Sequence, residues 1–157
     1  MAVRSPVLGN KGVGWVPAAA LRLKPQLLRL EVDLSKRELS LVFLRSAPEG
    51  RLVEDERRMS VAIGAADTPT PTGEFYVTDK LRGGDFGPYY GCCILALSGR
   101  QPKLPQGWSG GDRLAIHGSP TRTWGKAVSN GCLHAPERKL RFLMEIVPLG
   151  TSVQIHA

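Results

Sequence analysis

Apolar and polar residues alternate along two successive runs in the first third of the chain. The run "LLRLEVDL" at residues 27–34 places an apolar residue at every second position, and "ELSLVFLR" at residues 38–45 repeats the pattern. Only the polar residues "SKR" separate the two runs. Because successive side chains of a strand point to opposite faces, a period of two indicates strands with one buried face. The two runs therefore predict a β-hairpin.

Short β-type runs continue to the C-terminus, separated by segments rich in Gly and Pro. Further strands are predicted over residues 57–64, 74–79, 92–98, 113–118 and 151–157, with turns or loops at 67–73, 80–91 and 99–112. Residues 136–147 have a helical period instead, because Leu140, Leu143, Met144 and Val147 recur at the spacing of one helix face. The fold class is therefore predicted to be mainly β, with one principal helix.

The length of 157 residues suits one domain with a substantial core. Residues 1–26 are rich in Gly, Pro and Ala and are predicted to be a lead-in, so that residues 27–157 form the main domain. No apolar run approaches the ~20 residues of a membrane span. The start of the chain also lacks the apolar core and cleavage site of a typical signal peptide. Composition leaves open a cytoplasmic protein and a domain of a longer, secreted chain.

The chain carries a net charge of +7, which suggests nucleic acid or an acidic polymer of the cell envelope as a partner. The basic residues are scattered, however, and aromatic residues make up only 6% of the chain. No basic helix or platform of stacking aromatic residues stands out, which argues against nucleic acid as the partner. A solvated basic surface explains the charge equally well.

The three cysteines are Cys92, Cys93 and Cys132. Adjacent cysteines rarely form a disulfide with each other, and in a strand their side chains point to opposite faces. Cys92 and Cys93 are therefore predicted to be buried core residues. No Cys-x-x-Cys pair with matching ligands is present, so we expect neither a metal site nor a cofactor.

Two of the three histidines and one cysteine lie in the stretch "HGSPTRTWGKAVSNGCLHA", residues 117–135. His117 ends a predicted strand, and Cys132 follows Gly131 a few residues before the predicted helix. A helix N-terminus lowers the pKa of a thiol, so Cys132 is predicted to be an activated thiol. A Cys–His pair suffices for acyl transfer through a thioester. The alternative is that both residues are structural, Cys132 as a small buried apolar side chain.

Several motifs that follow one another along the chain favour the catalytic role of His117 and Cys132 over the structural one. Ile116-His117-Gly118 and Ser129-Asn130-Gly131-Cys132-Leu133 closely resemble the two halves of the signature of the L,D-transpeptidase catalytic domain, the YkuD-type family. The segments "VDLSKRELSLV", "SVAIGAADTPTPTGEFYV" and "LGTSVQI" resemble other segments of that family, in the family's order. The resemblance covers about residues 27–157. More weakly, "GWVPAAALRL" resembles the last strand of a bacterial SH3-like domain.

The resemblance implies a β-sandwich-like catalytic fold and a cysteine acyl-transferase that acts on peptidoglycan stem peptides. Cys132 is implied to be the nucleophile and His117 the base. Main-chain N–H groups of Gly131 and Cys132 would form the oxyanion hole, and Ser129, Asn130 and Gly118 would line or order the site. The implied partners are a tetrapeptide donor, an amine acceptor and carbapenem inhibitors. Because the family acts outside the cytoplasm, we expect an extracytoplasmic location and export by a segment that this sequence does not show.

The sequence departs from the family at two positions, Asn130 and His134. Many members have His or Lys at the first and Arg or Asn at the second. His134 is predicted either to bind a substrate carboxylate or to make a structural hydrogen bond. The turn Thr70–Gly73 and the loop residues Tyr89, Tyr90 and Trp108 are each predicted either to contact substrate or to serve packing alone. Hydrolysis by the same site, as an L,D-carboxypeptidase, and an inactive wall-binding module remain as alternative functions.

Overall fold

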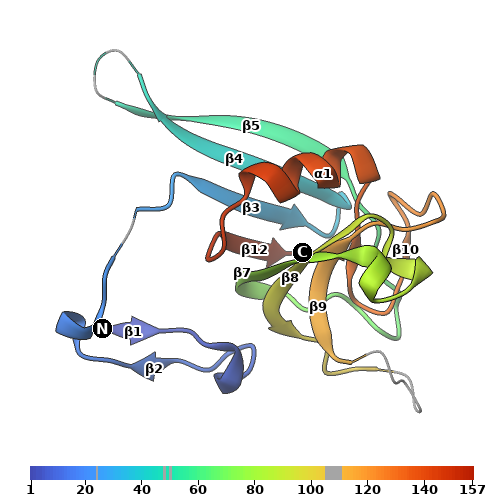
Figure 1. Cartoon of the computed structure of the whole chain (residues 1–157), viewed down its shortest axis with the longest axis horizontal. Coiled ribbons are helices and arrows are strands. Elements are labelled where there is room, and N and C mark those ends of the chain that lie inside the picture. The colour runs from blue at the N-terminus through green and yellow to red at the C-terminus, as the bar shows by residue number, and fades with distance from the viewer. Residues whose placement is uncertain (24, 48, 50, 105–110) are drawn as a thin grey trace.

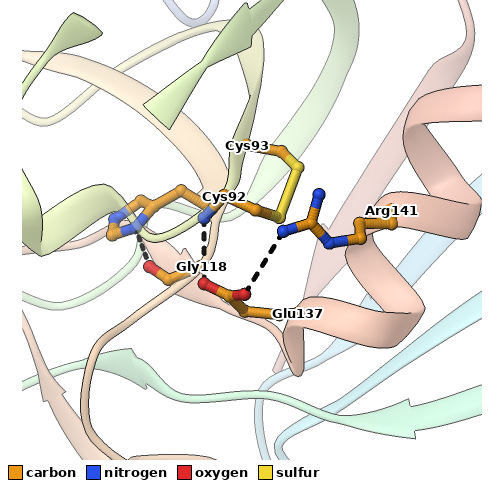
Figure 2. The surroundings of a disulfide bond; sticks show 6 residues. Cys92, Cys93, Gly118, Glu137 and Arg141 are labelled. Carbon is orange, nitrogen blue, oxygen red and sulfur yellow. Dashed lines mark hydrogen bonds and ion pairs between the residues drawn. A yellow bond between two sulfur atoms is a disulfide. The ribbon is translucent and has the colours of Figure 1, made fainter. Parts of the chain in front are cut away.

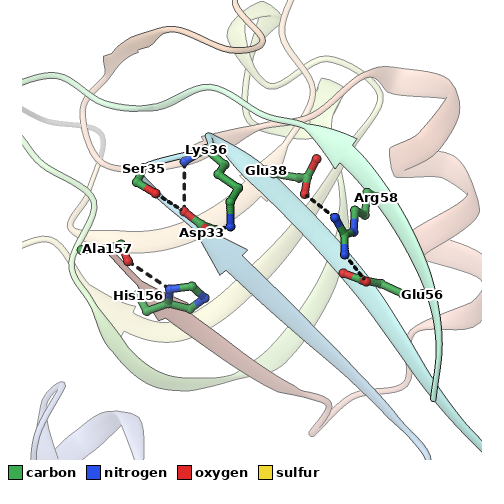
Figure 3. A network of polar contacts seen from close by, with 8 residues as sticks. All are labelled: Asp33, Ser35, Lys36, Glu38, Glu56, Arg58, His156 and Ala157. Atoms are coloured by element: carbon green, nitrogen blue, oxygen red, sulfur yellow. Dashed lines mark hydrogen bonds and ion pairs between the residues drawn. The ribbon is translucent and has the colours of Figure 1, made fainter. Parts of the chain in front are cut away.

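The alternating runs form the predicted hairpin. In the computed structural model, which describes residues 1–23, 25–47, 49, 51–104 and 111–157, β3 (Leu28–Asp33) pairs antiparallel with β4 (Glu38–Ser46). The Asp33 carboxylate stabilises the turn between them, because it accepts hydrogen bonds from the Ser35 hydroxyl and the main-chain N–H of Lys36 and also pairs with the Lys36 ammonium group (Figure 3). The Lys36 and Ser35 bonds hold the pKa of Asp33 well below its usual range.

Eight strands form one sheet in the order β11-β9-β8-β7-β12-β3-β4-β5. Figure 1 shows that this sheet is curled. The remaining members are β5 (Leu52–Ser60), β7 (Gly73–Arg82), β8 (Cys93–Arg100), β9 (Arg113–His117), β11 (Leu133–His134) and β12 (Ser152–His156). Most neighbours are antiparallel, but β12 runs parallel to β3 and β11 parallel to β9. The prediction of a mainly β fold is confirmed.

One α-helix, α1 (Glu137–Ile146), lies in the described part of the chain. Leu140 and Leu143 on this helix are fully buried in the main core, and Val147, which follows the helix, is also fully buried. The core is filled mainly by aliphatic side chains from the inner face of the sheet, among them Leu30, Leu41, Leu95, Ile116 and Leu133. The predicted helix and its apolar face are both confirmed.

The prediction of one continuous strand over residues 57–64 is wrong. The strand is broken, because β5 ends at Ser60 and β6 (Ile63–Gly64) leaves the main sheet to pair with β10 (Ala127–Ser129). β10 and β11 are three and two residues long, too short to show a period in the sequence. The predicted loop at 80–91 begins later than expected, because β7 continues to Arg82, and contains the short 3-10 turns η3 (Gly83–Asp85) and η4 (Pro88–Tyr90).

The N-terminal segment forms a small unit beside the sheet (Figure 1). Its strands β1 (Ala2–Val3) and β2 (Gly14–Trp15) pair with each other, and 3-10 turns follow each of them, η1 (Pro6–Leu8) and η2 (Ala18–Ala20). The Asn10 amide contacts the end of β8, donating to the Arg100 carbonyl oxygen and accepting from the Arg100 N–H, both at 2.7 Å. The domain boundary at residue 26 and the SH3-like origin of this segment stay predictions.

No helix in the described ranges has the length and hydrophobicity needed to cross a bilayer. The charges on the outer face of β3, β4 and β5 are largely paired with one another, as Arg58 shows by contacting both Glu56 and Glu38 (Figure 3). Such exposed ion pairs stabilise a fold only slightly. The stability of the domain therefore depends on its apolar core.

Leu143→Ala tests the packing of α1. The leucine is fully buried in the core, so its truncation is expected to lower the free energy of unfolding by ~2–5 kcal/mol. Urea unfolding followed by circular dichroism measures the change. Leu149→Ala is the matched control, because this leucine is 57% exposed and its loss is expected to cost less than ~0.5 kcal/mol. Equal losses in the two variants would contradict the position of α1.

Candidate active site

Parallel pairing of β11 with β9 brings the candidate histidine and cysteine to one place. Leu133 is opposite Ile116 and His134 is opposite His117 in this pair. Leu133 and Ile116 belong to the main core, whereas Cys132 packs against a second cluster formed by Ile94, Ala96 and Ala115. Since alternate residues of a strand face opposite ways, the two clusters lie on opposite faces of the sheet. The register of β9 and β11 thus places Cys132 and His117 on the same face of the sheet.

His117 is buried and its ring is held in one tautomer. Its Nδ1 atom lies 2.5 Å from the carbonyl oxygen of Gly118. A carbonyl oxygen can only accept, so Nδ1 carries the hydrogen and Nε2 keeps its lone pair. Burial, with a smaller effect of His134, lowers the pKa of His117 to about 4, against the opposing Gly118 bond. At neutral pH the ring is therefore an uncharged base with Nε2 as its acceptor atom.

The Cys132 thiol is in its neutral form as well. Its hydrogen bond goes to the Arg113 carbonyl oxygen at 3.8 Å. Burial raises the pKa of Cys132 to about 11, although a hydrogen bond with the main chain of Ala115 opposes the shift. The sequence-based prediction of a lowered thiol pKa is therefore wrong. In the free protein Cys132 is therefore a thiol and His117 a neutral imidazole, and the two do not form a thiolate–imidazolium pair.

The helix does not lower the pKa of the thiol, because α1 and Cys132 pack on opposite faces of the sheet. Leu140 and Leu143 place α1 in the main core, whereas Cys132 packs on the other face of the sheet. The carboxylate of Glu137, the first helical residue, accepts the main-chain N–H of Cys92 at 2.9 Å (Figure 2). Removal of the thiol from water thus outweighs any field of the helix dipole at Cys132.

His134 and Tyr90 complete the surroundings of His117. The ring centroids of His134 and His117 are 4.6 Å apart, and Thr123 Oγ1 lies 3.0 Å from Nδ1 of His134. Burial lowers the pKa of His134. The Tyr90 ring packs 4.9 Å from the His117 ring. Burial raises the pKa of Tyr90, and Tyr90 and Cys132 pack against the same cluster of Ile94, Ala96 and Ala115.

The other candidate aromatic residues behave differently. Tyr89 is 77% exposed, whereas the ring of its neighbour Tyr90 packs on His117. Trp108 lies outside the described residues. Tyr90 therefore has a packing role against His117. The Tyr89 ring is accessible from solvent, so a contact with substrate stays a prediction for this residue.

Ser129 orders the turn that precedes Cys132. Its hydroxyl donates to the Cys132 carbonyl oxygen at 2.5 Å and accepts the Gly131 N–H at 3.1 Å. Asn130 is exposed, and its carbonyl oxygen faces the buried amide of Gln101. Gly131 has φ of +109°, and a Cβ atom there would lie 2.1 Å from Nε2 of Gln101. Only glycine fits this position, for conformational and steric reasons together.

Gln101 and two threonines support this turn, and no sequence pattern pointed to the glutamine. The Gln101 amide donates to the carbonyl oxygens of Thr68, Pro69 and Asn130, at 2.9–3.3 Å. The hydroxyls of Thr68 and Thr70 donate to the carbonyl oxygens of Ser129 and Gly131. A lone Gln in a polar loop has no pattern that distinguishes it from a solvated side chain. The Thr70 turn thus contacts the segment that precedes Cys132.

Cys92 and Cys93 form a disulfide, so the prediction that they do not bridge is wrong (Figure 2). The argument from strand alternation failed because Cys92 lies in a turn and β8 begins only at Cys93. The turn also supports the histidine. The Cys93 carbonyl oxygen accepts the Gly118 N–H at 3.2 Å, and Gly118 in turn binds the His117 ring. Cys132 is the free cysteine.

Within the described ranges, no group of three or more His, Cys, Asp or Glu side chains is arranged to hold a metal ion. The fold and the site together define a mainly β domain with a buried histidine, His117, and a partly buried cysteine, Cys132, on one face of its sheet. The family model of the L,D-transpeptidase catalytic domain matches residues 28–155, and the chain belongs to this family.

Two curated relatives illustrate the likeness. The protein named "Putative L,D-transpeptidase YkuD" of Bacillus subtilis is 37% identical over 99 residues, which are 61% of this chain and 51% of the relative. A protein of the same name from Bacillus licheniformis is 35% identical over 111 residues, 67% of this chain and 58% of the relative. The chain thus spans between half and three fifths of the length of these relatives.

Solved structures share the fold. Bd1075 of Bdellovibrio bacteriovorus superposes with a TM-score of 0.62 at 20% identity, over 83% of this chain and 48% of the other. L,D-transpeptidase 3 of Mycobacterium tuberculosis, solved with a faropenem-derived adduct, gives 0.58 at 18% identity, over 83% and 60%. At these identities the likeness establishes the arrangement of the strands and α1.

The protonation states predict how Cys132 reacts with iodoacetamide. Only the thiolate reacts, and its fraction grows about tenfold per pH unit below the thiol pKa. With that pKa raised to about 11, the alkylation rate is expected to rise throughout pH 6–10 without a plateau. Stopped-flow or mass-spectrometric rates measure this, with Cys132→Ala as the unreactive control. A plateau below pH 8 would instead indicate a preformed ion pair.

Proposed function

We propose that this domain is a cysteine acyl-transferase of peptidoglycan stem peptides, an L,D-transpeptidase with Cys132 as nucleophile and His117 as base. The observation that carries the proposal is the parallel register of β9 and β11, which places both residues on one face of the sheet, with Nε2 of His117 as the acceptor nitrogen. Membership of the family supports the substrate class. Peptidoglycan as substrate implies an extracytoplasmic location.

In the first half-reaction the Cys132 sulfur attacks the carbonyl carbon of the tetrapeptide donor. The thiol proton passes to Nε2 of His117. Because the two pKa values lie far apart, this transfer accompanies formation of the carbon–sulfur bond and does not precede it. The tetrahedral intermediate then collapses to a thioester, and the terminal D-Ala leaves as an amine that takes the proton from the imidazolium.

In the second half-reaction an amine of a neighbouring stem attacks the thioester. His117 accepts a proton from this amine and returns it to the departing sulfur, which restores the thiol. Water in place of the amine would make the same site an L,D-carboxypeptidase. The neutral resting state of the pair protects the thiol from reagents that do not bind beside His117, because only a bound carbonyl makes the proton transfer favourable.

Acylation of Cys132 tests the proposal. Incubation with a disaccharide-tetrapeptide is expected to give an acyl-enzyme that has lost D-Ala, and a carbapenem is expected to add one drug mass, both on the peptide that contains Cys132. Imipenem and a faropenem-derived adduct are present in structures with this fold, which supports the second expectation. Intact-mass spectra and peptide mapping provide the measurement.

Cys132→Ala is the control for that measurement and is expected to form neither adduct while unfolding at an unchanged temperature. Added amine acceptor distinguishes transfer from hydrolysis, since a cross-linked product appears only in the first case. Absence of both adducts from folded wild-type protein would refute the acyl-transferase assignment and favour an inactive wall-binding module.

We further propose that His134 binds a substrate carboxylate. A charged imidazole makes a stronger hydrogen bond to a carboxylate than a neutral one does, and the carboxylate raises the pKa of His134 from its lowered value in the free protein. Binding is therefore expected to weaken as the pH rises through the pKa of His134 in the complex. His117 contributes little to this pH dependence, because its pKa of about 4 lies below the pH range of the measurement.

The measurement is calorimetric binding of a tetrapeptide stem to Cys132→Ala protein between pH 5.5 and 8.5, with and without His134→Arg. The arginine is expected to remove the pH dependence and to tighten binding by ~1 kcal/mol. Flat and identical curves for the two proteins would show that the bond to Thr123 is the whole role of His134.

A further inference from the structure

Every main-chain carbonyl from Ser129 to Cys132 accepts a hydrogen bond. The Ser129 carbonyl accepts from the Ala65 N–H and from Thr68 Oγ1, and the Asn130 carbonyl accepts from Gln101 Nε2. The Gly131 carbonyl accepts from Thr70 Oγ1, and the Cys132 carbonyl accepts from Ser129 Oγ. Three of the four carbonyls are therefore bound by side chains that lie far away in the sequence. The orientation of each peptide group before the nucleophile is set by a specific partner.

The third of these bonds fixes the direction of the Cys132 N–H. Thr70 Oγ1 donates to the Gly131 carbonyl oxygen at 2.9 Å. The peptide bond between Gly131 and Cys132 is trans, so its C=O and N–H groups lie in one plane and point in opposite directions. Because the carbonyl points towards Thr70, the N–H of Cys132 points directly away from it.

We propose that Thr70 is a positioning residue that directs the Cys132 N–H towards the oxyanion of the acyl intermediate. The inference rests on the proposed function. The Gly131 N–H, the other candidate donor, is already bonded to Ser129 Oγ. Stabilisation of the oxyanion by this turn therefore depends on Cys132 N–H, whose direction is set through the carbonyl that Thr70 holds. A correctly directed main-chain donor matters most in the transition state, where the negative charge develops.

The Thr70 hydroxyl is itself held in one orientation. It accepts the Gly64 N–H at 2.8 Å, so its own hydrogen is free to be directed to Gly131. Gly64 lies in β6, which pairs with β10 immediately before the turn. A Cβ atom on Gly64 would lie 2.2 Å from the Thr68 carbonyl oxygen, so the close approach of the two segments needs glycine. Thr70 is buried, with 5% of its surface exposed, so its hydroxyl is shielded from competing water.

Two reactions of the same sulfur distinguish this role from general support of the turn. Acylation by a carbapenem breaks the β-lactam C–N bond through a tetrahedral oxyanion, and the thiol proton passes by way of His117 to the ring nitrogen. Alkylation by iodoacetamide displaces iodide from a saturated carbon and develops no oxyanion. A misdirected Cys132 N–H is therefore expected to slow the first reaction and not the second.

The experiment compares second-order rates of both reactions at Cys132 in wild type, Thr70→Val, Thr70→Ser and Thr151→Val. Thr70→Val removes the hydroxyl at nearly constant volume and is expected to slow acylation by roughly tenfold to a hundredfold, with alkylation within about twofold of wild type. Thr70→Ser keeps the hydroxyl and is expected to acylate at close to the wild-type rate.

Thr151→Val is the matched control, because Thr151 is also buried and its hydroxyl also donates to a main-chain carbonyl, that of Pro148, before β12. It is expected to leave both rates unchanged. Melting temperatures are measured for all variants. If Thr70→Val does not fold, Thr70→Ala, which removes the same hydroxyl with a smaller side chain, is used for the same pair of rates.

Three outcomes would overturn the proposal: an unchanged acylation rate in the hydroxyl-free variant, an equal fall in both rates, or failure of Thr70→Ser to restore acylation. Failure of the proposed function looks different. In that case the wild-type protein itself is alkylated at Cys132 but not acylated, and the inference about Thr70 fails with it.

Discussion

The short parallel contact between β9 and β11 is the constraint on which the site depends. Leu133 and Ile116 are both fully buried in the main core, and this burial holds the two strands in register. Because the side chains of a strand alternate, burial of these two residues places His117 and Cys132 on the other face of the sheet. A slip of one residue would bury the histidine in the core and separate it from the thiol.

The electrostatics of the site follow from that placement. Ile94, Ala96, Ala115 and the Tyr90 ring lie on this second face, where His117 is buried and Cys132 is partly buried. Desolvation then disfavours both charged forms, lowering the pKa of His117 and raising that of Cys132. The two residues are a poor ion pair in the free protein, and the same desolvation would strengthen hydrogen bonds to the intermediate of the proposed reaction.

Polar main-chain contacts hold the two proposed catalytic residues, and these contacts come from separate parts of the chain. Gly118 binds the His117 ring and is itself bound by Cys93, at the end of the turn that Glu137 supports. On the other side, Ser129, Gln101 and the two threonines fix the peptide groups before Cys132. The strand pairing thus places Cys132 and His117 on one face of the sheet, and these contacts orient the His117 ring and the peptide groups before Cys132.

The sequence by itself determined the hairpin at residues 27–45, the helix with its face of Leu140 and Leu143, and the family, because periodicity and contiguous motifs are local properties. It did not determine the protonation of Cys132, the Cys92–Cys93 disulfide, the two- and three-residue strands or the role of Gln101. Each of these depends on segments distant in sequence: burial behind β8 and β9, the turn before β8, and pairing across the sheet. Desolvation and main-chain hydrogen bonding act between neighbours in space, so only the tertiary structure decided them.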